Sequence, residues 1–292
     1  MFPYRQQKIM LRQARKLSIT LLQLFLFSNS YIALGAVVMC WITARLFHLK
    51  LPVLFLLFIF LGTLSSYALH WYLTPTALNQ RERNQWNRRH KPTLLGIFIG
   101  SSVLLLALLS QLLPYLFYFM PVIVATFLYT APKINHRPFR YLRQIAILKT
   151  AYLAFVWTFV TAVLPLLVAT TAWTATMSLW AINRFLFLYC LCFWFDYRDR
   201  DDDRRSRWLT LVSMMTYQRA LYIFYGLAGC FTVSLVMLYL HGMTFRSIIG
   251  IGTPMLLLAG TVQSIPYWVS DYWYYAYLDG LLILSGLFVC LV

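Results

Sequence analysis

The stretch "LFLYCLCFWFDYRDRDDDRRSRWLTL", from Leu186 to Leu211, joins an apolar run directly to a dense group of charged residues. Five of the eight Asp and Glu residues of this 292-residue chain fall between Asp196 and Asp203. The apolar part has the composition of a membrane-spanning helix, and no turn residue separates it from the acids. The stretch therefore predicts a membrane helix that ends in an acidic segment.

Composition places the whole chain among integral membrane proteins. Hydrophobic residues make up 61% of it and charged residues only 11%, and its mean hydropathy is +0.68. Soluble domains contain about 25% charged residues, whereas a helix that crosses a bilayer needs about 20 apolar residues in a row. Many such runs are present, and no polar segment is long enough for a soluble domain. The sequence thus predicts a single all-α membrane bundle over residues 1–292.

Apolar runs between charged and helix-breaking residues predict about nine transmembrane helices. These runs lie near residues 18–46, 51–73, 94–112, 115–131, 147–169, 176–196, 217–240, 246–264 and 271–291. Pro114, Pro121 and Pro165 can bend or end helices at membrane depth, because neighbouring helices satisfy the backbone groups that a proline leaves unpaired.

Basic residues are divided unequally between the two ends of these helices. Twenty-one of the 25 Lys and Arg residues fall in the N-terminal segment 1–17 and in the segments after the second, fourth and sixth runs. The opposite side holds only Arg45, Lys50 and Arg246, and Arg184 lies inside the sixth run. Because cytoplasmic loops are enriched in Lys and Arg, we expect the N-terminus and the acidic stretch in the cytoplasm and the C-terminus outside.

The net charge of +17 does not by itself indicate a nucleic-acid partner. The basic residues sit in short segments between membrane helices, where topology and contact with anionic lipid headgroups account for them; a specific site for a polyanion is the alternative. All five cysteines lie in apolar runs, and no Cys/His spacing of a zinc site occurs,. We therefore expect membrane lipids as partners and no nucleic acid.

The spacing of the aspartates selects three of them. If the sixth helix continues past Phe195, Asp196, Asp199 and Asp203 fall within roughly 60° of one another, because each residue turns a helix by about 100°. Asp201 and Asp202 project elsewhere. Three carboxylates on one face repel each other and so need a cation, and Mg²⁺ prefers carboxylate, water and phosphate oxygens. The alternative is a charged loop whose acids are neutralised by the neighbouring arginines.

Three segments resemble the UbiA-type intramembrane prenyltransferase superfamily. The stretch from Phe193 to Leu211 is similar to its second aspartate-rich motif. "LKTAYLAFVWTFVTAVLP", residues 148–165, resembles its fifth helix, with a lysine at the cytoplasmic start. "LYTAPK", residues 128–133, resembles the tyrosine-bearing end of its fourth helix. The resemblance covers most of the chain, and nine helices is the count of that family.

The resemblance implies a function and a set of site residues. Members of the family bind a polyprenyl diphosphate through Mg²⁺ and transfer the prenyl group to a lipophilic acceptor, commonly an aromatic ring. It implies Asp196, Asp199 and Asp203 as catalytic Mg²⁺ ligands. The residues expected to bind substrate are Lys149, Tyr129, Arg137, Arg140, Arg200, His70 and Asn79. Cationic side chains and Mg²⁺ would neutralise the charge that develops on the departing diphosphate.

One family feature is absent, which keeps a second interpretation open. The first acidic cluster should follow the second helix, but "SSYALHWYLTPTALNQRERNQWNRRHK", residues 65–91, contains Glu82 as its only acid. The alternative is therefore a non-catalytic UbiA-like protein that binds an isoprenoid or another lipid. A transporter receives little support, because charged residues deep in the predicted spans are few. The Asp-Gly and Ala-Arg elements of CDP-alcohol phosphotransferases are absent.

Overall fold

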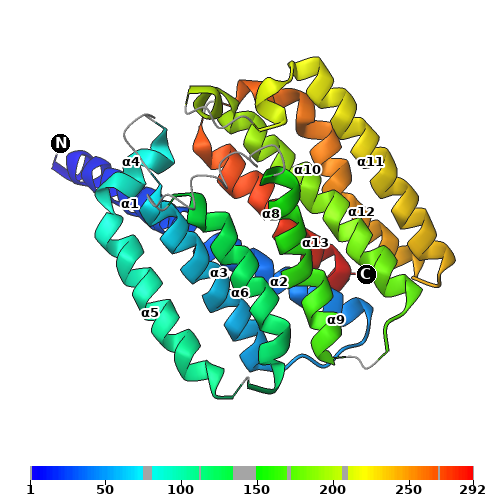
Figure 1. Ribbon diagram of the computed structural model, residues 1–292. Helices are drawn as coiled ribbons and strands as arrows, with labels where there is room; N and C mark the ends of the chain where they lie inside the picture. The colour runs from blue at the N-terminus through cyan, green and yellow to red at the C-terminus, as the bar shows by residue number, and fades with distance from the viewer. Residues whose placement is uncertain are drawn as a thin grey trace.

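The computed structural model is a bundle of helices, and no strand occurs in the part of the chain that it describes (Figure 1). The described residues are 2–74, 81–111, 113–133, 149–169, 172–205, 210–268 and 270–291. Asn79, Arg137 and Arg140, three of the predicted site residues, lie outside these ranges.

Twelve α-helices carry the architecture of the described chain. They are α1 Phe2–Phe27, α2 Ser30–Leu46, α3 Val53–Leu73, α4 Glu82–Arg89, α5 Lys91–Leu109, α6 Leu116–Thr130, α8 Lys149–Thr158, α9 Leu164–Ala169, α10 Ala175–Arg205, α11 Tyr217–Leu240, α12 Phe245–Thr261 and α13 Asp279–Leu291. Short 3₁₀ segments cover Leu113–Tyr115, Ala131–Lys133, Val212–Met214 and Val262–Tyr267, and π-helical segments cover Phe159–Val163 and Trp273–Leu278.

The predicted membrane class is confirmed, but the count of nine spans is not. Seven helices in the described part of the chain are long and apolar enough to cross a bilayer, or eight if the bent pair Lys16–Phe27 and Ser30–Leu46 forms one span. The bend of 55° in this pair occurs at Asn29, whose φ of 74° is left-handed. The last predicted run, 271–291, is divided into a π-helical segment and the 13-residue helix α13.

Helix α10 lies inside the bundle. It packs against α8 on one side and α11 on the other, and Trp180, Phe187 and Trp194 on it are completely buried. By contrast, α5 exposes Val103, Leu104 and Leu106, as expected for a helix in contact with lipid tails. The helix that carries the acidic stretch is therefore the one most enclosed by its neighbours.

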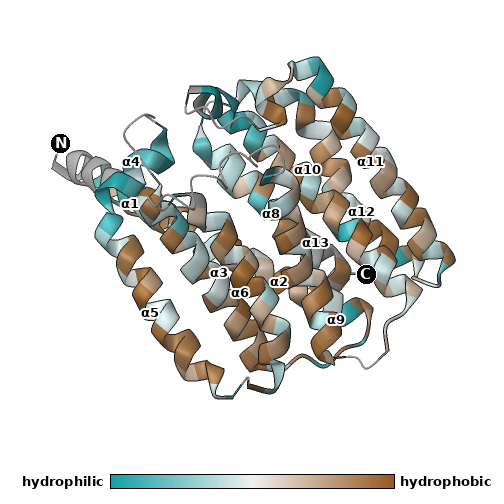
Figure 2. Ribbon diagram, viewed as in Figure 1, coloured by the Kyte–Doolittle hydropathy of each residue, from teal (hydrophilic) through white to brown (hydrophobic). Residues whose placement is uncertain are grey.

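Hydrophilic residues gather at one end of the bundle, around α4 and the C-terminal end of α10, as Figure 2 shows. We call this end the basic end, and it comprises α4, the ends of α3 and α6, the start of α8, the C-terminal turns of α10 and residues 270–275. The agreement between this segregation and the charge map supports one polar face for the bundle. Which side of the membrane it faces stays a prediction.

Candidate functional site

Five helices bring their polar side chains together at the basic end. Their ends are far apart in the sequence and adjacent in space, since α10 packs against α8 and α6 packs against both α3 and α8. Because α10 continues as one helix to Arg205, the aspartates project from a rigid element. The backbone is therefore helical through all five aspartates of the acidic stretch, as the prediction from the helical wheel requires.

Asp196 faces the start of α8. Its side chain is buried, with 7% of the residue exposed. The Lys149 ammonium lies 3.4 Å from its Oδ1 atom, and the Thr150 hydroxyl donates a hydrogen bond to its Oδ2 atom. The structure thus directs the Lys149 side chain toward the acidic stretch, and Thr150 is a second partner that the sequence did not indicate.

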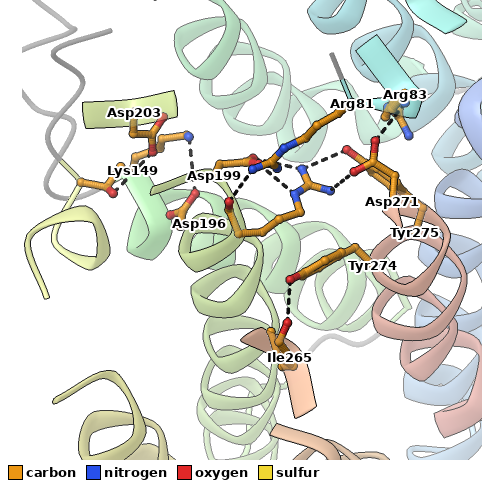
Figure 3. Close-up of polar contacts among 12 residues, drawn as sticks. Arg81, Arg83, Lys149, Asp196, Asp199, Asp203, Ile265, Asp271, Tyr274 and Tyr275 are labelled. Carbon is orange, nitrogen blue, oxygen red and sulfur yellow. Dashed lines mark hydrogen bonds and ion pairs between the residues drawn. The ribbon is translucent and has the colours of Figure 1, made fainter. Parts of the chain in front are cut away.

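Asp199 faces a different set of partners. Arg81 donates to its Oδ1 atom at 2.6 Å, and Arg198 donates to both carboxylate oxygens at 2.8 and 3.0 Å. A guanidinium nitrogen of Arg198 also lies 3.9 Å from Asp271. Figure 3 shows Asp199 directed toward Arg81, while Asp196 and Asp203 lie on the side of Lys149. Charge-assisted bonds of this kind are strong, so Asp199 is neutralised within the protein.

Of the two other aspartates of the acidic stretch whose side chains are described, one is buried and one is exposed. Asp203 is 9% exposed and accepts a hydrogen bond of 3.5 Å from Thr210. The Asp201 side chain is 62% exposed and lies 3.7 Å from Arg200 and 3.9 Å from Arg204. Arg200, which was predicted to bind substrate, also stacks on Tyr197 at 4.0 Å and so faces Asp201 rather than Asp196.

The donor set at the end of α10 does not form a ready metal site. Within the described residues, no group of three or more His, Cys, Asp or Glu side chains has an arrangement that could hold a metal ion. The physical reason is visible in the ion pairs, because Lys149 and Thr150 hold Asp196 whereas Arg81 and Arg198 hold Asp199. The side chains as they lie therefore do not fit the predicted three-carboxylate Mg²⁺ site.

A second cation, Lys133, lies across the site at the end of α6. Its ammonium is 2.6 Å from Nε2 of His70 and hydrogen-bonds the Thr74 hydroxyl. The Trp71 ring lies 5.6 Å from the same ammonium. Burial, together with the charges of Lys149 and Arg83, lowers the pKa of Lys133 well below its usual value. Within the described residues Lys133 forms no ion pair, and an anion would compensate its charge.

His70 and Tyr129 form the wall beside Lys133. The two rings are stacked, with centroids 5.1 Å apart and planes inclined by 16°. About two helical turns beyond Lys149 on α8 the interior becomes aromatic, and there the Trp157 indole donates a 3.0 Å hydrogen bond to the Tyr67 hydroxyl. The site therefore combines cations at the rim with aromatic faces beneath them, which can stabilise a carbocation.

Arg83 fixes α4 over the end of the bundle. The residue is 3% exposed, and its guanidinium lies 4.2 Å from the rings of both Trp71 and Tyr275. It donates to Asn29 at the bend between α1 and α2, and its backbone N–H donates to Asp271 at 2.9 Å. Burial lowers the pKa of Arg83. This arginine connects the bend between α1 and α2, α3, α4 and the segment that leads into α13.

Sequence reasoning found some of these residues and missed others. Lys149, Asp196, His70 and Tyr129 were expected at the site, and the structure brings all four to the basic end. Lys133 was missed as a site residue although it follows Tyr129 by four positions in "LYTAPK". Nothing in the sequence marks Arg81 as a partner of Asp199, because the two residues lie 118 positions apart. Arg198 is adjacent to Asp199 in the sequence and was not expected as its partner.

A comparison with solved structures identifies the fold. The chain is similar to the apo structure of a UbiA homolog from Aeropyrum pernix K1, with a TM-score of 0.59 and 13% sequence identity. The match covers 91% of this chain and 96% of that one. No protein-family model matches the chain, and no curated protein matches it. The predicted resemblance to the UbiA-type superfamily is confirmed at the level of the fold.

Proposed function

We propose, from the UbiA-type fold and the cations at its basic end, that this protein binds a polyprenyl diphosphate and transfers the prenyl group to a lipophilic acceptor, such as an aromatic ring, inside the membrane. The observation that carries the proposal is the pair of ammonium groups at the mouth of an apolar bundle. Lys133 contacts His70 and the Thr74 hydroxyl, and Lys149 contacts Asp196 at 3.4 Å. A diphosphate placed between them would compensate both charges.

The site residues suggest how the transfer would proceed. Diphosphate leaves with the electron pair of the allylic C–O bond, and the ammonium groups of Lys133 and Lys149 stabilise the negative charge that develops on it. The allylic carbon carries positive charge near aromatic faces such as Tyr67 and Trp157, which stabilise cations. The acceptor then forms the new bond and loses a proton. Much of the rate enhancement would come from holding the prenyl diphosphate and the acceptor side by side in the site.

Mg²⁺ binding by Asp196, Asp199 and Asp203 stays a prediction of the sequence. A metal at this place would have to replace the contacts of Asp199 with Arg81 and Arg198. Since carboxylates that hold Mg²⁺ usually share it with substrate phosphates, the exchange would accompany diphosphate binding. No step of the proposed transfer depends on it.

Non-catalytic binding of an isoprenoid or another lipid is the second candidate function. It is favoured by the end of α3, where His70 lies beside Lys133 in the region that the family resemblance assigns to the first acidic cluster. A protein of this kind would retain the prenyl diphosphate without breaking its C–O bond. The two functions therefore differ in diphosphate release and not in binding.

Purified full-length protein in liposomes tests the proposal. Labelled farnesyl and geranylgeranyl diphosphates are added with a lipid extract of the source membranes, and bound substrate and released diphosphate are measured separately. We expect both binding and release, and weaker binding in Lys133→Met. Lys50→Met is the matched control, because Lys50 lies at the opposite end of α2 and α3. Binding without release would favour the second function, and no binding would refute both.

A further inference from the structure

Asp279 differs from every other acidic side chain that the structure describes. Glu82, Asp271 and the described aspartates of α10 each have a hydrogen bond or an ion pair. For Asp279, neither kind of contact occurs within the described residues, although only 6% of the residue is exposed. A buried carboxylate without such a partner is costly in any protein, and inside a membrane it indicates a functional site.

A helix-capping role does not explain this carboxylate. Asp279 is the first residue of α13, but the chain before it is already helical, since the π-helical segment Trp273–Leu278 runs into α13 without a break. The backbone N–H of Asp279 donates to the carbonyl of Tyr274, so the amide groups of the first turn do not need a side-chain acceptor. π-helical turns are frequent at functional sites.

The position of Asp279 is inside the bundle, beneath the diphosphate site. It follows Asp271 by eight residues, about two turns of helix, and Asp271 belongs to the basic end through Arg83 and Arg198. Helix α13 packs against α2 and α12, and Asp279 interacts electrostatically with Tyr31 on α2, Tyr67 on α3 and Cys192 on α10. With 6% of the residue exposed, Asp279 therefore lies in the interior of the bundle.

The same neighbours connect Asp279 to the proposed diphosphate site. Cys192 lies one helical turn before Asp196 on α10 and interacts electrostatically with Asp196, Lys149 and Asp279. Tyr67 interacts with both Tyr129 and Asp279. Arg83 and Arg198, whose charges act on Asp279, are held by Asn29, Asp199 and Asp271. Asp279 and the proposed diphosphate site thus share Cys192 and Tyr67 as neighbours.

We propose that the Asp279 carboxylate takes the proton that the acceptor loses during prenyl transfer, an inference that rests on the proposed function. Diphosphate leaves with the C–O electron pair, and an electron pair of the acceptor forms the new bond to the allylic carbon. The O–H or ring C–H bond at the attacking atom then breaks, its electrons stay on the acceptor, and its proton moves to Asp279. The acceptor is thus a phenol or another lipophilic compound with a proton to lose at that atom.

The test compares two variants of Asp279 with a matched control. Asp279→Asn removes the base and keeps the shape, Asp279→Glu keeps the base, and Asp201→Asn makes the same amide change on an exposed aspartate of the basic end. Each full-length protein is reconstituted in liposomes with labelled geranylgeranyl diphosphate and a lipid extract of the source membranes. Binding of geranylgeranyl thiolodiphosphate, which resists ionisation, is measured in parallel.

We expect Asp279→Asn to bind the thiolodiphosphate as the wild type does and to transfer label at least about 100-fold more slowly, since general bases contribute 10²–10⁴-fold. Asp279→Glu should recover part of the rate, and Asp201→Asn should stay within about twofold of the wild type. A structural role would instead lower binding in both Asp279 variants or leave Asp279→Glu as slow as Asp279→Asn.

Four results would overturn the inference, and they are distinguishable; the first is Asp279→Glu that transfers label as slowly as Asp279→Asn. Transfer by Asp279→Asn at the wild-type rate, or loss of thiolodiphosphate binding in both Asp279 variants, removes Asp279 from the reaction while the proposed function stands. Wild-type protein that binds the thiolodiphosphate and transfers no label refutes the transferase, and the role of Asp279 with it.

Discussion

The charge of Lys133 is the feature of this site whose contribution can be measured most directly. Its ammonium contacts His70 at 2.6 Å and the Thr74 hydroxyl, and it forms no ion pair within the described residues, so a diphosphate would place an anion directly against it. We expect Lys133→Met to weaken binding of geranylgeranyl thiolodiphosphate, because the variant removes a donor from the anion and adds no repulsion.

The size of the expected loss of affinity follows from the burial of Lys133 and from the kind of contact that its ammonium makes. A hydrogen bond to a charged group contributes about 1.5–3 kcal/mol, and each 1.4 kcal/mol changes an affinity tenfold. Lys133 is partly buried, so solvent screens the interaction only in part. The loss in Lys133→Met should therefore be about 10- to 100-fold. Lys50→Met, at the opposite end of the bundle, should bind as the wild type does.

The pH dependence provides an independent check on the same residue. Burial and the neighbouring charges of Lys149 and Arg83 lower the pKa of Lys133, and the protonated form is the one that binds an anion. Affinity in the wild type should therefore be constant below this lowered pKa and fall as the pH rises through it. Lys133→Arg should keep its affinity over the same range, because a guanidinium is not deprotonated.

Equilibrium binding of labelled thiolodiphosphate to protein in liposomes is the assay, measured from about pH 6 to 10. The terminal phosphate titrates near the lower limit, and comparison with Lys133→Arg at each pH removes its contribution. Two results would refute the reasoning. One is Lys133→Met with the affinity of the wild type. The other is a wild-type affinity that falls with pH no more steeply than that of Lys133→Arg, which would mean that the ammonium of Lys133 does not bind the anion.

Three further predictions follow from other parts of the structure. Mg²⁺ should increase thiolodiphosphate affinity in the wild type and in Asp201→Ala but not in Asp196→Ala, Asp199→Ala or Asp203→Ala. Equal effects in all four variants would contradict a Mg²⁺ site and favour a charged helix end without a metal. Arg83→Lys should destabilise the protein by about 2–3 kcal/mol, because lysine loses the flat contacts with Trp71 and Tyr275; a thermal midpoint no lower than that of the exposed-site control Arg88→Lys would contradict this. A reporter fused after residue 292 should lie outside the cell, and a cytoplasmic reporter would overturn the predicted orientation.

The sequence alone determined the membrane class, the helical fold and the end of the bundle at which chemistry is expected. Composition and run length are sufficient for the first two, since hydrocarbon admits a helix of about 20 apolar residues and little else. The acidic stretch also carried enough local information to be assigned to a helix end, and α10 continues through it to Arg205. The resemblance of the motifs to the UbiA-type superfamily pointed to the fold that the structural comparison shows.

Only the tertiary structure decided which partners these side chains have. A helical wheel gives the direction of Asp196 and Asp199 around their own axis, but it does not give the neighbouring helices. The two differ by three residues, yet one faces Lys149 on α8 and the other faces Arg81 before α4. The sequence places Asp279 in an apolar last span, and only the packing of α13 against α2 and α12 buries its carboxylate. Burial and pairing depend on contacts between segments far apart in the chain, and charge pairs of this kind leave no periodic signal in the sequence.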